Sequence, residues 1–275
     1  MRILITGAGG QLGRALATAL GEHEVIALER PQLDIVELAA VRAAVAAHRP
    51  AAILNAAAYT LVDRAESEPD SAFRGNATGP RNLALAAAEA GAALVHLSSD
   101  YVFDGEASRP YHEFDAPHPL SVYGWSKLAG ETAVRELNPR HFVVRTAWLY
   151  APVGRNFAAS VRSRAAQGPV RVVTDQVGSP TFAPHLAAAI ARLLPTAAFG
   201  TYHLAGAGAT SWHGFAVELF GRLGLGASVE PTTSDQFPRR ARRPRYAPLV
   251  TLQEPRLLLP PWEEGVAAYA ALVRS

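Results

Sequence analysis

The sequence of 275 residues contains no cysteine, and only one of its 26 basic residues (Lys+Arg) is a lysine, Lys127. Without cysteine there is no disulfide bond, no thiolate metal site and no cysteine nucleophile. The sequence also lacks hydrophobic runs long enough to span a bilayer. A signal peptide needs a long apolar stretch near the start of the chain, but a glycine-rich segment begins there at residue 7. We therefore expect a cytoplasmic protein with no membrane partner.

The net charge is small, at +2, but arginine is concentrated in one place. Residues 239–245 read RRARRPR. A run of this kind serves nucleic acid, a membrane surface or a phosphate-bearing ligand, or it is a solvated loop. The residues of the run alone leave these alternatives open.

Strands and helices alternate through the first half of the chain. The predicted strands are Arg2–Thr6, Glu24–Leu28, Ala52–Asn55, Ala92–Leu97 and His141–Thr146, with shorter ones near Val170–Val173 and Thr201–Leu204. The predicted helices are Gln11–Leu20, Glu37–His48, Asp70–Ala90 and Val122–Leu137. This alternation is typical of βαβ units, so the predicted fold class is α/β, a doubly wound parallel sheet of the Rossmann type.

The second half has a different texture, because proline and glycine become frequent after Tyr150. We interpret residues 1–150 as a dinucleotide-binding domain that also takes in returning segments of the second half. Residues 151–275 are predicted to form mainly a smaller, non-contiguous substrate-binding lobe.

Glycines at positions 7, 10 and 13 form the segment GAGGQLG between the first predicted strand and the first predicted helix. Glycine permits a tight turn and lets backbone N–H groups approach a pyrophosphate, while the helix that starts at Gln11 adds its positive dipole end. The triplet alone is weak evidence, but its place between strand and helix predicts a dinucleotide site. The predicted contacts there are Gly7, Gly10, Gln11, Leu12 and Gly13.

The ends of the second and third strands add further candidates for cofactor binding. Glu29 suits a ribose 2′-OH, whereas Arg30 suits a 2′-phosphate, so the choice between NADH and NADPH stays open. Asp34 and Ile35 follow in the position of a loop over the adenine. The residues that end the third strand, Asn55, Ala56, Ala57 and Ala58, are mostly small and leave room for a cofactor, although alanine is also simply common in this chain.

Tyr123 and Lys127 lie four residues apart in VYGWSKLAGE and so project from one face of a helix. Reduction of a keto group needs a proton donor, and a phenol takes part at neutral pH when a nearby cation stabilises its phenolate. The segment Ser98-Ser99-Asp100 closes the fourth strand, where a hydroxyl such as that of Ser99 can hold a substrate carbonyl. Chance explains the Tyr–Lys pair alone, but it explains poorly that the pair includes the only lysine.

With these motifs in place, the chain resembles the dTDP-4-dehydrorhamnose reductase family, a branch of the extended short-chain dehydrogenases/reductases. The resemblance runs nearly end to end and rests on these segments: GAGGQLG, NAAAYTLVDRAE, NATGPRNLA, LSSDYVFDG, PLSVYGWSKLAGE, RTAWLY, DQVGSPT and TSWHGFA. It implies NADPH- or NADH-dependent reduction of the 4-keto group of a nucleotide sugar, which in that family is dTDP-4-dehydro-L-rhamnose.

The resemblance also assigns roles to individual residues. It implies that Tyr123 is the general acid, that Lys127 binds the nicotinamide ribose and that Ser99, often threonine in the family, contacts the substrate carbonyl. Asp100, Tyr101 and Trp148 correspond to substrate-lining positions. Arg243 is expected near the substrate diphosphate rather than on nucleic acid, although RPRYAPL departs from the family pattern here.

Other properties stay open. No spacing of residues indicates a metal site, so a metal requirement is unknown, and a homodimer is possible. Two rival functions share the resemblance: another nucleotide-sugar epimerase or dehydratase of the same fold, and a non-catalytic regulatory subunit like that of methionine adenosyltransferase. The second rival predicts loss of Ser99, Tyr123 or Lys127, all of which are present.

Overall fold

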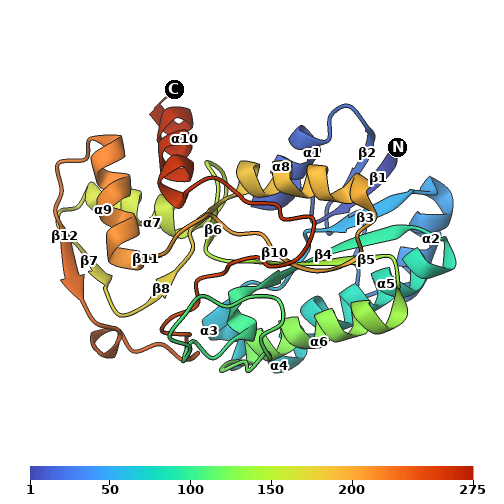
Figure 1. Cartoon of the computed structure of the whole chain (residues 1–275), viewed down its shortest axis with the longest axis horizontal. Coiled ribbons are helices and arrows are strands. Elements are labelled where there is room, and N and C mark those ends of the chain that lie inside the picture. Colours follow the sequence, from blue (N-terminus) through green and yellow to red (C-terminus); the bar gives the residue numbers. More distant parts are fainter. Residues whose placement is uncertain (275) are drawn as a thin grey trace.

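The computed structural model describes residues 1–274, and a six-stranded sheet lies at its centre. Neighbouring strands are all parallel, in the order β10-β5-β4-β3-β1-β2 (Figure 1). They are β1 (Arg2–Thr6), β2 (Glu24–Leu28), β3 (Ala52–Asn55), β4 (Ala93–Ser99), β5 (His141–Thr146) and β10 (Gly200–His203). All carboxyl ends therefore meet at one edge of the sheet.

Helices cover both faces of this sheet. One face carries α1 (Gln11–Ala19) and α8 (Ala183–Leu193), and the other carries α2 (Leu38–His48), α5 (Gly79–Glu89) and α6 (Val122–Leu137). Alternation along β1 shows why: Ile3 and Ile5 pack into the first layer, while Leu4 packs into the second. The predicted α/β fold with a doubly wound parallel sheet is confirmed.

The helix predicted over Asp70–Ala90 is not continuous in the structure. The segment predicted as a single helix over Asp70–Ala90 consists of α4 (Pro69–Phe73), a π-helical turn η1 (Arg74–Thr78) and α5. Pro80 has no N–H group and cannot donate to the carbonyl oxygen of Asn76 four residues earlier. That oxygen instead lies against α6, only 2.1 Å from where a Cβ atom on Gly130 would stand.

The second half contributes more helix than the sequence indicated. A group of elements at the left of Figure 1, here called the C-terminal lobe, has its own hydrophobic core around Phe215, Leu219 and Tyr269. It comprises α7 (Phe157–Ala165), α9 (Trp212–Leu223), α10 (Trp262–Arg274) and the parallel pair β7 (Val170–Val173) and β12 (Val229–Thr232). By contrast, α8 and β10 return to the main sheet.

Several short elements complete the fold. The strand pairs are β6 (Leu149–Tyr150) with β9 (Thr181–Phe182) and β8 (Val177–Gly178) with β11 (Thr210–Ser211), and the short helices are α3 (Val62–Ala65), η2 (Asp100–Val102), η3 (Leu194–Thr196) and η4 (Ser234–Gln236). Residues 241–252, here called the strap, form bridges through Tyr246 to Val177 and through Leu249 to Tyr111. The strap thus joins the loop after β4 to the segment that carries β8.

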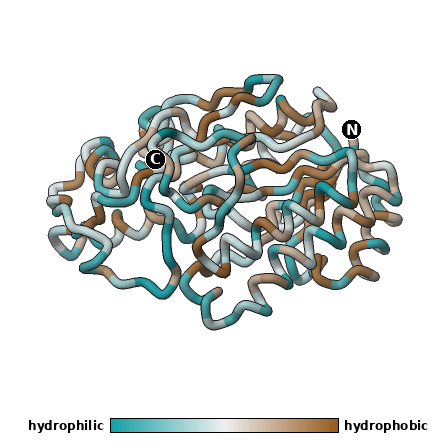
Figure 2. Tube along the Cα trace, turned by 60° about the horizontal axis from the view of Figure 1, so that its bottom comes forward, coloured by the Kyte–Doolittle hydropathy of each residue, from teal (hydrophilic) through white to brown (hydrophobic). Residues whose placement is uncertain are grey.

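Hydrophobic segments run along the central strands, and the outer loops are largely hydrophilic (Figure 2). Among residues 1–274, no helix combines the length and the apolar character that crossing a membrane requires. The packed helices on both faces of the sheet hold the carboxyl ends of its strands in place, and the candidate site lies at this edge.

Candidate active site

A cleft of about 1660 Å³ opens at the carboxyl edge of the sheet and brings most of the predicted site residues together. The predicted residues that line it are Gly7, Gly10, Gln11, Leu12, Glu29, Arg30, Asp34, Ile35, Ala56, Ala57, Ala58, Ser99, Asp100, Tyr101, Tyr123, Lys127 and Trp148. Three predicted residues, Gly13, Asn55 and Arg243, do not line it. Ligands of open α/β sheets bind at this edge.

The glycine turn has the shape of a phosphate cradle. Gly7 has a φ of 67°, and a Cβ atom there would lie 2.5 Å from the backbone nitrogen of Ala57. Gly13 lies under the turn, where a Cβ atom would be 2.3 Å from the carbonyl oxygen of Gly7. Gly10 precedes α1 and supplies no side-chain cap, so the N–H groups of the first turn stay available for an anion. These residues fit a dinucleotide pyrophosphate.

Glu29 and Arg30 both reach the cleft at the end of β2, but their surroundings differ. A Cβ atom on Gly9 would lie 2.7 Å from the Glu29 carboxylate, so this acid rests directly on the glycine turn. The Arg30 guanidinium is exposed and pairs with Asp34 at 3.3 Å. Glu29 is therefore placed to accept a hydrogen bond from a ribose hydroxyl. The Arg30 guanidinium lies at the mouth of the cleft, where it could meet a phosphate group.

Asn55 supports the cleft from below. Its side-chain oxygen accepts hydrogen bonds from Thr6 Oγ1 at 2.8 Å and from the backbone of Ala57 at 3.2 Å. Its amide group donates to Nδ1 of the buried His96 at 3.1 Å. Asn55 therefore ties the ends of β1 and β3 to the middle of β4 and holds the small residue Ala57, rather than contacting the cleft itself.

Tyr123 and Lys127 lie on α6 as predicted, and both face the cleft. The buried Lys127 ammonium donates a hydrogen bond to the carbonyl oxygen of Leu97. Burial lowers the pKa of Lys127 to about 8, and the charge of Glu131 opposes this shift. Burial raises the pKa of Tyr123, as do nearby charges, so the phenol keeps its proton across the physiological range.

Ser99 lies at the end of β4 beside a buried acid. Its hydroxyl donates to Asp100 Oδ1 at 2.8 Å and accepts a hydrogen bond from the backbone of Tyr101 at 3.2 Å. Burial raises the pKa of Asp100 to about 7, while hydrogen bonds from Ser99 and the backbone oppose the shift. The Tyr101 ring contacts the Tyr123 ring edge to face at 5.3 Å. Hydroxyl, carboxyl and phenol thus converge on one wall of the cleft.

Two further cleft residues, Trp212 and Thr146, carry an aromatic ring and a hydroxyl that the sequence patterns did not indicate. Trp212 of α9 stacks on Trp148 with ring centroids 3.5 Å apart and an interplanar angle of 4°. Thr146 lies in register with Ser99 across β4 and β5, and its buried hydroxyl has no hydrogen-bond partner among the described residues. The motifs TSWHGFA and RTAWLY contain these residues, but neither pattern shows that they face a common cleft.

Trp148 adopts an unusual backbone conformation. Its φ of 45° lies in the left-handed region, which a bulky residue rarely occupies. The indole also needs Gly178, where a Cβ atom would lie 2.5 Å from Trp148 Cε2. Strain of this kind persists only where the surroundings fix it, and here Gly178 and Trp212 do so.

Arg243 lies in the strap and is held by an acid. It forms a two-pronged ion pair with Asp63, at 3.0 and 2.8 Å, and its charge opposes the burial that raises the pKa of Tyr101, a residue that lines the cleft. The pair lowers the pKa of the Asp63 carboxyl. Arg243 is therefore next to the cleft rather than in its lining. Within residues 1–274, no group of three or more His, Asp or Glu side chains is arranged to hold a metal ion.

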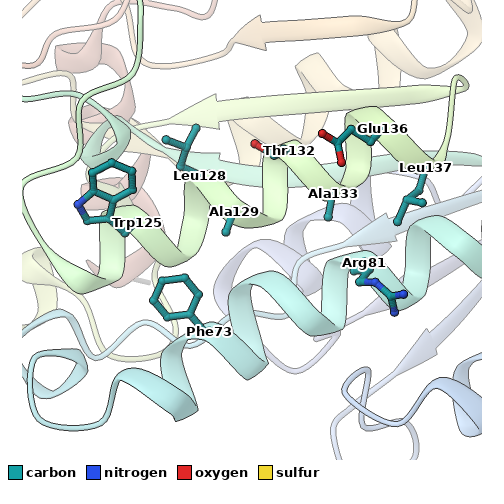
Figure 3. A pocket seen from close by; sticks show the side chains of 9 residues that line it. All are labelled: Phe73, Arg81, Trp125, Leu128, Ala129, Thr132, Ala133, Glu136 and Leu137. Carbon is teal, nitrogen blue, oxygen red and sulfur yellow. The ribbon is translucent and has the colours of Figure 1, made fainter.

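A second hollow lies outside the cleft, between α4, α5 and α6 (Figure 3). This groove has a volume of about 510 Å³ and is mainly apolar. Figure 3 shows Trp125, Leu128, Ala129 and Ala133 along α6, with Phe73 and Arg81 on the facing helices. None of its lining residues belongs to the predicted site.

Comparison with known proteins identifies the family. The chain matches the family described as RmlD substrate binding domain over residues 1–275. The chain belongs to this family. It is 48% identical over 258 residues to a dTDP-4-dehydrorhamnose reductase from Streptomyces griseus, which covers 90% of this chain and 85% of the relative.

Solved structures of the family agree closely with the fold. A dTDP-4-dehydrorhamnose reductase from Clostridium acetobutylicum superposes with a TM-score of 0.98 at 41% identity, covering 100% of both chains. A dTDP-4-dehydrorhamnose reductase from Bacillus anthracis, in complex with NADP, gives a TM-score of 0.95 at 38% identity, covering 100% of this chain and 99% of the other. The resemblance predicted from the sequence motifs is thus confirmed.

The glycine turn generates a first prediction. We expect Gly13→Ala to weaken NADPH binding by about tenfold or more, equivalent to about 1.4 kcal/mol, because the new methyl group displaces α1 from the turn. Fluorescence of bound NADPH measures the affinity. Gly21→Ala is the matched control, since a Cβ atom there meets only the Thr18 carbonyl oxygen at 3.4 Å. Equal affinity of both variants would contradict the assigned role of the turn.

Proposed function

We propose that this protein reduces the 4-keto group of dTDP-4-dehydro-L-rhamnose to give dTDP-L-rhamnose, with NADPH or NADH as reductant. The observation that carries the proposal is that Ser99, Tyr123 and Lys127 line the same cleft as the glycine turn. Membership of a family whose relatives are named dTDP-4-dehydrorhamnose reductases supports the choice of substrate. We further propose that the reaction takes place in the cytoplasm.

The glycine turn and α1 are proposed to hold the cofactor pyrophosphate, with Glu29 and Arg30 at the adenosine ribose. Asp34, Ile35 and residues 56–58 are proposed to line the rest of the cofactor site. When bound, the reduced nicotinamide supplies the hydride. The NADP complex of the Bacillus anthracis relative supports this assignment.

The side chains of the cleft supply the rest of the chemistry. Ser99 hydrogen-bonds the substrate carbonyl oxygen and orients it. Tyr123 donates its phenolic proton to that oxygen as negative charge develops there. Burial raises the pKa of Tyr123 and keeps the phenol protonated before the reaction, so a nearby cation is needed to make it an effective acid. Lys127 holds the nicotinamide ribose, and its ammonium group stabilises the phenolate that remains.

Substrate binding is proposed to involve both parts of the molecule. Asp100, Tyr101 and Trp148 line the cleft beside Ser99, and the C-terminal lobe adds Trp212. We propose that this lobe, together with the strap, forms the sugar-nucleotide site. Arg243 is proposed to bind the diphosphate through its guanidinium group, in place of its ion pair with Asp63.

A direct assay tests the function. Oxidation of NADPH and NADH is followed with a panel of 4-keto nucleotide sugars that differ in sugar and base. We expect turnover with dTDP-4-dehydro-L-rhamnose to exceed that with the other sugars. The absence of turnover with every 4-keto sugar would contradict a reductase and would favour a non-catalytic binding protein.

The epimerase or dehydratase alternative predicts a different fate for the cofactor. An epimerase regenerates its cofactor within each cycle and retains it, whereas a reductase must exchange it. Dialysis of the purified protein, followed by a spectrum of the denatured supernatant, distinguishes the two. Stoichiometric retained NAD(H) would favour the epimerase.

We propose that the groove of Figure 3 is the interface of a homodimer. Its apolar floor is bordered by one cation, Arg81, and one anion, Glu136, and neither has an ion-pair partner among the described residues. A second copy therefore brings both apolar surface and opposite charges to this face. Light scattering in solution measures the mass, and a monomer at all concentrations would contradict the proposal.

The Tyr123–Lys127 pair generates a second prediction. Lys127→Arg keeps the charge, but the longer planar guanidinium displaces the phenol, and a misplacement of about 1 Å costs on the order of a hundredfold in rate. Tyr123→Phe should lose a comparable factor because the proton donor is gone. The double variant should lose far less than the product, since the two residues act as a unit. Turnover is measured, with circular dichroism as the folding control; near-wild-type turnover of Lys127→Arg would contradict the assigned geometry.

Cofactor choice generates a third prediction. Because Glu29 and Arg30 both reach the cleft, we expect both cofactors to be accepted with a modest preference. Arg30→Ala should raise the KM for NADPH roughly tenfold, as expected for loss of a charge-assisted hydrogen bond of about 1.5 kcal/mol. The KM for NADH should change little. Equal losses for both cofactors would show that Arg30 does not recognise the 2′-phosphate.

The diphosphate assignment generates a fourth prediction. We expect Arg243→Ala to raise the KM for the sugar nucleotide roughly tenfold, with little change in NADPH affinity. Arg239→Ala is the matched control, because Arg239 is an exposed arginine of the same run that lies 3.8 Å from Asp63. Tight and steeply salt-dependent binding of duplex DNA by the wild type would instead support a nucleic-acid function for the run.

A further inference from the structure

Glu131 is a fully buried carboxylate on the helix that carries Tyr123 and Lys127. It lies one turn beyond Lys127 and two turns beyond Tyr123, on the same helical face. A buried charge is costly unless it is paired and hydrogen-bonded.

Four donors surround the Glu131 carboxylate. Oε1 accepts hydrogen bonds from Ser98 Oγ at 2.5 Å and Arg145 Nε at 2.9 Å. Oε2 accepts from Arg145 Nη2 at 2.7 Å and from Arg135 Nη1 at 3.0 Å. The carboxylate is thus fully satisfied in its ionised form, and its pKa is lowered by Arg145 and Ser98 despite burial.

These contacts join α6 to the catalytic end of the sheet. Ser98 directly precedes Ser99, and it lies in register with Arg145 across β4 and β5. One carboxylate therefore fastens the helix that presents the phenol and the amine to the strand end that presents the hydroxyl. The relative position of the three proposed catalytic groups depends on this connection.

The network continues beyond Arg145. Arg145 Nη1 lies 3.5 Å from His203 Nε2, and His203 Nδ1 faces the carbonyl oxygens of Tyr111 and Val250 at 3.1 Å. Two carbonyl acceptors require the proton on Nδ1, and burial lowers the pKa of His203 to about 4, so the ring is neutral. Val250 belongs to the strap, so the same network also anchors the segment that carries Arg243.

Lys127 faces few charges. Glu131 attracts its ammonium group from the same helix, and His96 approaches from β4 with a pKa that burial lowers, so that this ring is neutral. Burial acts against the ammonium form, and Glu131 is the charge that opposes burial. Arg145 and Arg135 lie on the far side of Glu131 and bind its oxygens directly.

We propose that Glu131 is a positioning residue of the reductase site: its buried carboxylate locks α6 to the Ser98–Ser99 end of β4 and sets a negative charge one helical turn from Lys127. The inference rests on the proposed function, because it gives Lys127 the task of a cation beside the phenol. A purely structural Glu131 would contribute to stability alone and would leave the titration of Lys127 unchanged.

The composition of the chain allows a direct test. Because Lys127 is the only lysine, labelling with 13Cε-lysine gives one side-chain resonance, and its chemical shift against pH reports the titration of this amine without substrate or cofactor. We expect a midpoint near 8 in the wild type. Glu131→Gln, which keeps the shape of the side chain but removes its charge, should lower the midpoint by about one unit or more.

Controls separate this effect from a general loss of charge or of structure. Glu264→Gln makes the same change on an exposed helical position of α10, outside the cleft and the groove, and should leave the midpoint where it is. Glu131→Gln leaves Arg145 as an unpaired buried charge, so the titration is repeated on Glu131→Gln/Arg145→Gln, in which loss of the positive charge opposes the effect and the midpoint should fall by less. An unchanged Lys127 midpoint in folded Glu131→Gln would overturn the proposal.

Kinetics add a second readout. If the midpoint falls by one unit from 8, the ammonium fraction at pH 8 falls about fivefold, whereas at pH 6 it barely changes. The ratio of Glu131→Gln turnover to wild-type turnover should therefore decrease as the pH rises. Glu131→Asp keeps the charge and should restore turnover at high pH. A constant ratio across pH would contradict the proposal. The NMR result stands whether or not dTDP-4-dehydro-L-rhamnose is the substrate.

Discussion

The in-register parallel pairing of β4 with β5 is the constraint on which the site depends. Residues opposite each other in a parallel sheet point to the same face, so the pairing sets Ser98 beside Arg145 and Ser99 beside Thr146. The first pair faces α6 and meets Glu131, while the second lines the cleft. A shift of one residue between the strands would put Arg145 and Ser98 on opposite faces, so that Glu131 could no longer bind both.

Features set by local sequence were predictable. The glycine turn follows from a strand, three spaced glycines and a helix start, and the Tyr123–Lys127 face follows from helical periodicity. Most predicted strands and helices agree with the structure within one or two residues, because buried parallel strands give continuous apolar runs. The break in the predicted helix over Asp70–Ala90 was missed, since it depends on Pro80 together with the close approach of Gly130 on α6.

Features set by long-range contacts were not predictable from periodicity. The stacking of Trp148 on Trp212 joins residues that are far apart in the chain, and so does the pairing of Arg243 with Asp63. Glu131 could not be singled out from the sequence, because a glutamate after VYGWSKLAG is as compatible with a solvent-exposed helix position as with a buried one. Only the positions of Ser98 and Arg145 on the neighbouring strands show that its carboxylate is buried.

The stacked tryptophans form a direct contact between the main-sheet part of the protein and the C-terminal lobe. Trp148 belongs to the segment that leaves the main sheet, and Trp212 begins a helix of the C-terminal lobe. Their faces are nearly parallel, with ring centroids 3.5 Å apart, so this contact tolerates a displacement within the indole plane but is lost when one ring tilts away from the other. The shape of the cleft wall therefore depends on the orientation of the lobe through two aromatic faces.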